Sequence, residues 1–203
     1  MTNRTVNHYR LILDDFRCLV KLAYHRAFLP GCGVKATRIT AVWPRHGTAA
    51  GGGKMTDDKQ TIARDVAETM IGNCGFSQGL GMRIADAGPD FAAIEMKLTS
   101  LHMNGHDICH GGAIFAMADT AFAHACNSDN IVTVAQQCQV NFLKPGKLGD
   151  VLCATAQARS LAGRTGIYDV AVTDQNGALI AEFRGMCRKL SGPVIPAKPD
   201  QHG

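Results

Sequence analysis

The stretch MNGHDICHGGAIFAMAD, Met103–Asp119, decides the fold, because a polar loop passes there into an apolar helix. The uninterrupted apolar run predicts a helix of about seventeen residues from Gly112 to Ser128. Asp119 is the only Asp, Glu, Lys or Arg among residues 108–128, and on a helical wheel it falls at the edge of the apolar arc. Its charge therefore meets a partner elsewhere in the fold or stays partly desolvated.

Both ends of this apolar run carry groups that are suited to catalysis. Desolvation raises the pKa of a carboxylate and makes it a better base or nucleophile; the alternative is that Asp119 points outward or bonds a nearby backbone amide. Gly111 and Gly112 let a ligand approach the first helical turn, where unpaired N–H groups and the helix dipole suit a developing oxyanion. The alternative there is that the glycines only permit a tight turn.

The distance between Gly111 and Asp119 along the helix limits how they can act together. Asp119 lies eight residues after Gly111, which is about 12 Å along a helix axis. A base and an oxyanion donor must both come within about 3 Å of the reacting atoms, so one helix cannot supply both to one carbonyl. A two-fold dimer with antiparallel helices side by side would bring them together and create two equivalent sites.

The flanking sequence predicts an α+β domain whose antiparallel sheet wraps around the central helix. A first helix is expected from Thr56 or Asp57 to about Ile71, with Ile62, Val66 and Met70 on one face. Two strands are expected around the turn AGPD, and a long strand from Ile131 closes at Pro145-Gly146. Three more strands are predicted at about 151–161, 166–173 and 179–189. The Gly79-Leu80-Gly81 match neither follows a strand nor opens a helix, so it indicates no dinucleotide site.

Composition bounds the rest of the chain. The 203 residues are 46% hydrophobic and 19% charged, which is ordinary for one globular domain. No window approaches the ~20 apolar residues of a membrane span, and Asp14 and Asp15 interrupt any signal peptide. We expect a cytoplasmic protein with a domain over 55–190 and a flexible tail over 191–203.

The first 54 residues differ from the remainder. They hold nine Lys or Arg against two acids and lack sustained periodicity, so residues 1–54 are predicted to be a basic, disordered extension or upstream translation from a misplaced start. The basic charge is compatible with a transit peptide or a nucleic-acid-binding arm, but the mixed composition and the acidic pair favour neither. No nucleic-acid partner and no membrane partner is therefore expected.

The cysteines and histidines do not show the spacing of a disulfide-bonded or metal-binding protein. The eight cysteines are scattered, without a C-x-x-C pair, which favours buried reduced thiols. His102, His106 and His110 recur every four residues, but the glycines around them make the segment a loop and H-E-x-x-H is absent. No metal site is expected.

A family resemblance rests on three segments: NGHDICHGGAIFAMADTAFAHACNS, VNFLKPGKLGDVLCATAQ and GRTGIYDV. Together they resemble the PaaI-type (phenylacetate-degradation) acyl-CoA thioesterases of the hotdog fold, over about residues 60–190. The resemblance implies hydrolysis of acyl-CoA, with aryl-CoA such as phenylacetyl- or hydroxyphenylacetyl-CoA favoured, to free acid and CoA. It implies no cofactor, because CoA is part of the substrate, and a homodimer with shared active sites that assembles into a homotetramer. It does not account for residues 1–54.

The resemblance also assigns roles residue by residue. Asp119 matches the catalytic carboxylate, as general base or nucleophile, and Gly111 matches the residue whose amide polarises the thioester carbonyl. His110 and Asn104 match the polar pair that positions the thioester and orients water; from the residues alone, they could equally be a helix cap and a turn residue. CoA-phosphate ligands stay unassigned, since a solvated face explains most of Lys144, Lys147, Arg159, Arg164 and Arg184.

Two other classes of protein were kept as alternatives. A hotdog dehydratase acting on 3-hydroxyacyl thioesters would share the fold but arrange its histidine and acid differently. A non-catalytic acyl-CoA sensor would need a DNA-binding helix-turn-helix, and residues 1–54 show no such helix pair.

Overall fold

The computed structural model describes residues 53–196. The predicted extension falls outside the described residues except for its last two positions, and so do the last seven residues of the predicted tail. The elements of the described range are α2 (Gly53–Gly72), α3 (Gly75–Gly79), β1 (Met82–Gly88), β2 (Phe91–Lys97), the 3₁₀ turn η1 (Ser100–His102), α4 (Gly111–Cys126), β3 (Ile131–Phe142), β4 (Val151–Ala162), β5 (Thr165–Thr173) and β6 (Leu179–Pro193).

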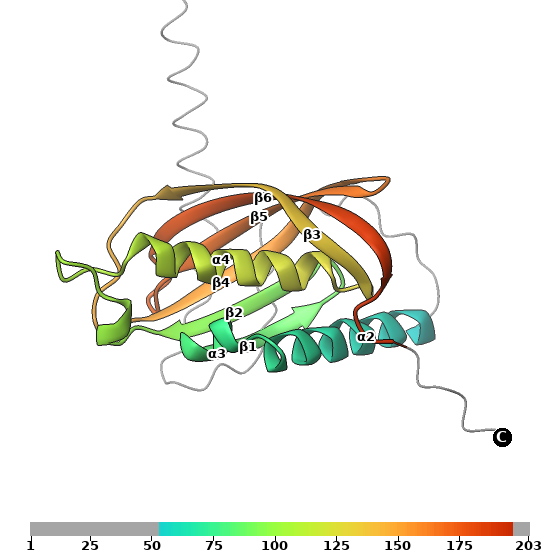
Figure 1. The fold of residues 1–203 in the computed structure, drawn as a ribbon, viewed down its shortest axis with the longest axis horizontal. Helices are drawn as coiled ribbons and strands as arrows, with labels where there is room; N and C mark the ends of the chain where they lie inside the picture. The colour runs from blue at the N-terminus through green and yellow to red at the C-terminus, as the bar shows by residue number, and fades with distance from the viewer. Residues whose placement is uncertain (1–52, 197–203) are drawn as a thin grey trace, which may run out of the picture. The chain divides into compact units, whose positions relative to one another are not determined.

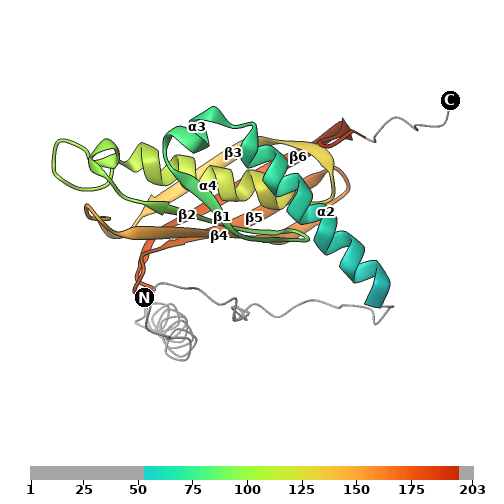
Figure 2. The same cartoon turned by 90° about the horizontal axis from the view of Figure 1, so that it is seen from below.

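The six strands form one antiparallel sheet in the order β1-β2-β4-β5-β6-β3. The sheet curves around α4, which lies along its concave face (Figure 1). Helices α2 and α3 lie beside β1, on the same side of the sheet as α4 (Figures 1 and 2). The predicted α+β architecture, a central helix wrapped by an antiparallel sheet, is confirmed.

Small residues let α4 sit close to the sheet. Ala118, Ala121 and Ala125 of α4 are fully buried, and so is Met117. Burying a large apolar side chain stabilises a fold by about 1.5–3 kcal/mol, so this face anchors the helix. Gly185 on β6 is required for the fit, because a Cβ there would lie 2.7 Å from the ring of Phe122.

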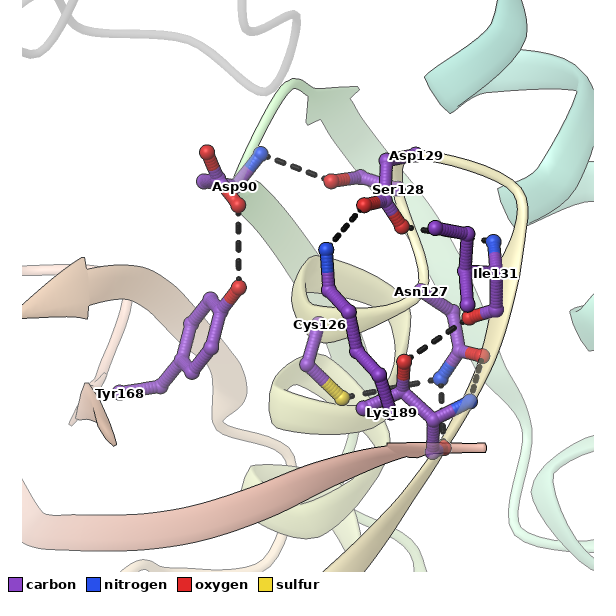
Figure 3. A network of polar contacts seen from close by, with 9 residues as sticks. Asp90, Cys126, Asn127, Ser128, Asp129, Ile131, Tyr168 and Lys189 are labelled. Carbon is purple, nitrogen blue, oxygen red and sulfur yellow. Dashed lines mark hydrogen bonds and ion pairs between the residues drawn. The ribbon is translucent and has the colours of Figure 1, made fainter. Parts of the chain in front are cut away.

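Polar side chains lock the C-terminal end of α4 (Figure 3). Buried Asn127 donates from Nδ2 to the carbonyls of Ala123 (2.9 Å) and Thr133 (3.0 Å), and its Oδ1 accepts from the Thr133 N–H (2.8 Å). One side chain thus joins the last turn of α4 to the start of β3. Nearby, the Tyr168 hydroxyl donates to Asp90 Oδ1 at 3.0 Å, which ties the β1–β2 turn to β5.

The two edges of the sheet differ. At the β1 edge α2 packs against the strand, Gln60 Nε2 donates to the Ala87 carbonyl (2.6 Å), and the strand register shifts between Ile84 and Asp86. At the other edge, β3 pairs with β6 and with no other strand of residues 53–196. Strand β3 also carries register shifts, between Ile131 and Thr133 and between Ala135 and Gln137, so the two edges differ in that a helix covers β1, and a covered edge is closed to another chain. The β3 edge is therefore the one open to a second copy.

Several details differ from the sequence prediction. The buried face of α2 is formed by Ala63, Val66 and Ala67. Of the residues predicted to share one face, Val66 is buried and Met70 is partly buried, but Ile62 is 42% exposed, so its placement was wrong. Short α3 was not predicted, because five residues carry no periodicity. Strand β6 continues to Pro193, beyond the predicted end of the last strand.

Candidate active site

Asp119 lies in the third turn of α4, where its side chain reaches Cys138 of β3. Its side chain is half-buried, and burial raises the pKa of the carboxyl above its ordinary value of 3.8. It lines a cavity of about 400 Å³ between α4 and the α2–α3 corner. The structure therefore provides a desolvated carboxylate that opens onto a space able to hold a ligand.

Cys138 on β3 is the side-chain partner of this carboxylate. Its Sγ donates to Asp119 Oδ1 at 3.7 Å, and this hydrogen bond opposes the rise in the Asp119 pKa. Burial and the neighbouring carboxylate raise the pKa of Cys138 to about 11, so the thiol stays protonated as a donor. Asp119 Oδ2 has no hydrogen-bond partner within residues 53–196, which leaves that oxygen available to a ligand.

Gly111 begins α4, and its N–H meets no acceptor in the described part of the chain. The first N–H groups of a helix lack intrahelical partners and sit at the positive end of its dipole. Phe142 at the end of β3 covers this glycine: a Cβ on Gly111 would lie 3.1 Å from the Phe142 ring. The structure therefore leaves an unsatisfied N–H at the positive end of the helix, partly shielded by an aromatic ring.

His110 is the N-cap of α4, where its Nδ1 accepts from the Gly112 N–H at 2.8 Å. A neutral imidazole that accepts at Nδ1 carries its proton on Nε2. The exposed ring therefore presents an Nε2–H donor beside the Gly111 amide. The helix-cap alternative and the site role predicted for His110 are compatible, because they use different ring nitrogens.

Asn104 shapes the loop before α4. Its Oδ1 accepts from the N–H of His106 (2.8 Å) and of Ile108 (3.4 Å), and its backbone N–H donates to the Ile108 carbonyl (2.9 Å). The amide oxygen therefore acts as a turn-forming acceptor, while Nδ2 makes no hydrogen bond to the described residues. A free amide donor remains on the loop that leads to the helix N-terminus.

Gly111 and His110 are neighbours at the start of α4, and Asn104 lies on the loop before them, next to the bridge between Met103 and Cys109, whereas Asp119 lies further along the helix. The carboxylate lies eight residues further along the same helix, about 12 Å along its axis. One copy of the chain therefore holds the two halves of the predicted site apart.

The remaining histidines of the loop have other environments. His102 is buried; its Nδ1 accepts from the Thr99 N–H (2.9 Å), and its Nε2 donates to the Leu80 carbonyl (3.0 Å). His106 is exposed. No group of three or more His, Cys, Asp or Glu side chains positioned to hold a metal ion occurs among residues 53–196.

The basic residues considered for phosphate binding lie on strands and loops of the later sheet. Arg184 forms a two-pronged ion pair with Asp169 (2.6 and 2.9 Å), so its guanidinium is already engaged. Lys144 and Lys147 are exposed in the β3–β4 loop, whose Gly146 carbonyl accepts from the Cys109 N–H at 2.8 Å. The loop that carries the two lysines therefore contacts the segment before α4.

Comparison with known proteins agrees with this geometry. Residues 106–181 match the model of the thioesterase superfamily. The acyl-coenzyme A thioesterase PaaI of Escherichia coli (strain K12) is 41% identical over 128 residues, 63% of this chain and 91% of that protein. A putative esterase of Archaeoglobus fulgidus is 32% identical over 141 residues, 70% of this chain and 92% of that protein.

A solved structure gives the same result. The E. coli PaaI protein from the phenylacetic acid degradation operon matches with a TM-score of 0.65 and 40% identity, over 66% of this chain and 97% of that one. The chain therefore belongs to the hotdog-fold thioesterase superfamily, and it is a thioester hydrolase. Within that superfamily it is similar to PaaI, so the predicted resemblance is confirmed. No helix of residues 53–196 is long and apolar enough to cross a membrane.

Sequence reasoning missed three features of the site. Cys138 was treated only as a buried thiol, although it bonds Asp119, and Phe142 was read only as a strand residue, although it covers Gly111. The α2–α3 wall of the cavity was also missed. Period-2 alternation on β3 could have placed Cys138 and Val140 on one face, but not against a particular helical residue.

Proposed function

We propose that this protein hydrolyses acyl-CoA thioesters to the free acid and CoA, with aryl groups such as phenylacetyl or hydroxyphenylacetyl as the preferred acyl part. The observation that carries the proposal is the half-buried Asp119 carboxylate, whose pKa burial raises and which opens onto an apolar cavity. Such a carboxylate is a stronger base and nucleophile than a solvated one. The E. coli relative, an acyl-coenzyme A thioesterase, supports the substrate class.

Asp119 acts on the thioester carbon by one of two routes. As a general base, it takes a proton from water, whose hydroxide adds to the carbonyl carbon; the C–S bond then breaks and the proton passes to the CoA sulfur. As a nucleophile, Asp119 Oδ2 attacks the carbon and expels the CoA thiolate, and water then hydrolyses the mixed anhydride. In both routes the carbonyl oxygen becomes an oxyanion that the Gly111 N–H stabilises. His110 Nε2–H and Asn104 Nδ2 position the thioester and the water.

The complete site needs two copies of the chain. About 12 Å of helix separates Asp119 from Gly111 within one copy, and β3 is the unpaired sheet edge next to both, through Cys138 and Phe142. Pairing of two β3 edges around a two-fold axis would place the carboxylate of one copy against the amide of its partner. We propose this homodimer as the active unit, with two dimers forming a homotetramer.

The test is turnover of an acyl- and aryl-CoA panel by the wild type and by Asp119→Asn, with release of the CoA thiol as the signal. The variant is expected to lose at least about a hundredfold in kcat, the scale of one positioned acid–base group, with its oligomeric state unchanged. Asp107→Asn is the matched control, because Asp107 is exposed on the preceding loop at φ 56°, where asparagine is also tolerated. Full activity in Asp119→Asn, or enoyl absorbance without thiol release, would contradict the proposal.

A further inference from the structure

The loop that carries Asn104 and ends at His110 is closed by a narrow neck. Met103 and Cys109 face each other across an antiparallel bridge, and the His110 N–H donates to the His102 carbonyl at 2.8 Å. Beyond this neck the loop is mostly exposed, so the neck is where it joins the packed part of the domain. The position of His110, the N-cap of α4, therefore depends on what fixes the neck.

His102 is the buried histidine of this neck. It is the last residue of η1 and is 3% exposed. Its Nε2 lies 3.0 Å from the carbonyl oxygen of Leu80; a carbonyl only accepts, so Nε2 carries the proton. Its Nδ1 is then the acceptor for the Thr99 N–H, at 2.9 Å. A neutral imidazole in this one tautomer satisfies both neighbours.

The hydrogen bond to Leu80 joins segments that are distant in sequence. Leu80 is the C-cap of α3, and the β1–β2 hairpin lies between it and His102 along the chain. The backbone hydrogen bonds of η1, from His102 to Thr99 and from Met103 to Ser100, are local. The imidazole therefore attaches the neck of the loop to the α3–β1 junction, which the local bonds cannot do.

A short series of hydrogen bonds leads from His102 to the start of α4. The His102 carbonyl holds the His110 N–H, and His110 Nδ1 accepts from the Gly112 N–H at 2.8 Å. Between these two contacts lies the Gly111 N–H, the proposed oxyanion donor. Such donors act through preorganisation at about 3 Å from the developing charge, and a displacement of about 1 Å can cost on the order of a hundredfold in rate. The anchoring of the neck therefore bears on the aim of this donor.

We propose that His102 is a positioning residue of the hydrolase. Its imidazole touches no substrate; by bonding Leu80 it fixes the neck of the loop, and the neck holds the Gly111 N–H and the His110 ring in place for the thioester. The inference rests on the proposed function for the role of these two groups. It extends the site to a buried side chain that lies behind the groups facing the substrate.

Substitutions at position 102 separate its two ring contacts. His102→Leu removes both. Glutamine carries its amide nitrogen near the Nε2 position, so His102→Gln can still donate to Leu80, whereas asparagine is shorter and His102→Asn reaches only Thr99. The comparison of asparagine with glutamine decides the question if His102→Leu does not fold. Asn127→Ala is the matched control, because it removes buried hydrogen bonds at the opposite end of α4 and no group of the site.

The kinetic test measures kcat and KM for phenylacetyl-CoA at a temperature where circular dichroism shows every variant folded. His102→Leu and His102→Asn are expected to lower kcat at least about tenfold, within the cost of a misplaced reacting group. KM should change less than about threefold, because the donors act mainly in the transition state. His102→Gln should recover most of the loss, and Asn127→Ala should keep the wild-type kcat. Equal losses in His102→Leu and Asn127→Ala would overturn the inference.

A double-mutant cycle tests whether His102 acts through the Gly111 end of the helix. Residues that act as a unit give non-additive losses, so His102→Leu should lower kcat much less in a Gly111→Ala chain than in the wild type. Additive losses would mean that the imidazole affects the rate by another route, and they also overturn the inference.

Hydrogen–deuterium exchange tests the anchoring without turnover. His102→Leu is expected to speed amide exchange in residues 103–112 at least about tenfold, the scale of one lost buried hydrogen bond, while residues 117–126 keep the wild-type rate. Unchanged exchange in 103–112 overturns the inference whether or not the wild type is active. Faster exchange with a wild-type kcat overturns it and leaves the hydrolase standing. A wild type that hydrolyses no thioester contradicts the proposed function, and faster exchange would then still support the anchoring of the neck by His102.

Discussion

The Cys138 thiol on β3 donates a hydrogen bond to Asp119 Oδ1 on α4, with an S–O distance of 3.7 Å. The contact joins the central helix to the edge strand of the sheet and occupies one carboxylate oxygen only. Because the raised pKa of Cys138 keeps its proton in place, the thiol fixes the carboxylate without competing with it as a nucleophile. Four measurable consequences concern this carboxylate and the Gly111 amide.

The first prediction concerns pH. The reaction needs ionised Asp119, so kcat/KM is expected to fall as the pH drops through the raised pKa of this group. The Cys138 hydrogen bond lowers that pKa; Cys138→Ala therefore moves the acid limb of the kcat/KM profile to higher pH. The kcat/KM profile is measured from the rate at which thioester absorbance is lost, over a series of acidic pH values. Cys138→Ser keeps a hydrogen-bond donor, so its acid limb should stay closer to that of the wild type. An acid limb that does not move in Cys138→Ala would show that the thiol does not influence the Asp119 pKa.

Asp119 also links function to stability. Burial raises its folded-state pKa above the ordinary 3.8, so the ionised form destabilises the fold at pH values above the folded pKa, and this effect vanishes below about 3.8. Asp119→Asn is therefore expected to unfold at higher temperature than the wild type at neutral pH, with the difference shrinking in acid. Thermal unfolding over a pH series checks both parts. If Asp119→Asn were less stable than the wild type at pH 7, the ionised Asp119 carboxylate would not destabilise the fold.

Steric contact at Gly111 gives a third prediction. Gly111→Ala places a methyl group 3.1 Å from the exposed Phe142 ring, which shifts the ring or the first turn of α4. The kcat of Gly111→Ala is expected to fall at least about tenfold, within the range for loss of an oxyanion donor's position. Phe142→Ala in the same chain relieves the contact, so a double-mutant cycle should show coupling. Additive effects would mean that the ring and the glycine act independently.

Shared sites can be tested by mixing two impaired variants. Equal amounts of Asp119→Asn and Gly111→Ala chains, unfolded and refolded together, should form half heterodimers, each with one intact site. About a quarter of wild-type activity is then expected, since one site in four carries both native groups. Separately refolded variants are the control. Activity no greater than the mean of the two variants would place each site within a single copy.

The hydrogen bonds of the Asn127 side chain at the end of α4 predict a large effect on stability. Asn127→Ala removes three buried hydrogen bonds and leaves the Thr133 N–H and carbonyl without this partner, while the Ala123 carbonyl keeps the backbone N–H of residue 127. Each orphaned buried group costs about 1–3 kcal/mol, so a loss of about 2–5 kcal/mol is expected in denaturant unfolding. Asn176→Ala, in an exposed turn, should stay within about 0.5 kcal/mol. Similar denaturant midpoints for Asn127→Ala and Asn176→Ala would show that the Asn127 hydrogen bonds contribute little to stability.

Much of the fold was predictable because its patterns are local. The apolar run after Gly111 predicted α4 to within two residues at its C-terminal end, and the AGPD turn predicted the β1–β2 hairpin, where Asp90 takes a φ of 55°. The half-burial of Asp119 also followed from its place on the helical wheel. These features depend on periodicity and turn chemistry, which a single sequence displays.

The rest depends on contacts between distant segments. Nothing near Cys138 indicates that it meets a helix nineteen residues earlier, nor that Phe142 covers Gly111. Ile62 was wrongly assigned to the buried face of α2 because Ala63 and Ala67, which are buried there beside Val66, carry little hydrophobic signal. Small buried residues are recognisable only when the partner surface is known.

The α2–α3 corner has a consequence for how such a molecule can change over generations. Its residues carry none of the groups assigned to bond breaking, and apart from Ser77 and Thr120 few side chains tie it to the central helix. Because the groups assigned to hydrolysis lie on α4 and on the loop before it, a substitution in α2 or α3 alters the shape of the cavity without replacing any group that acts on the thioester.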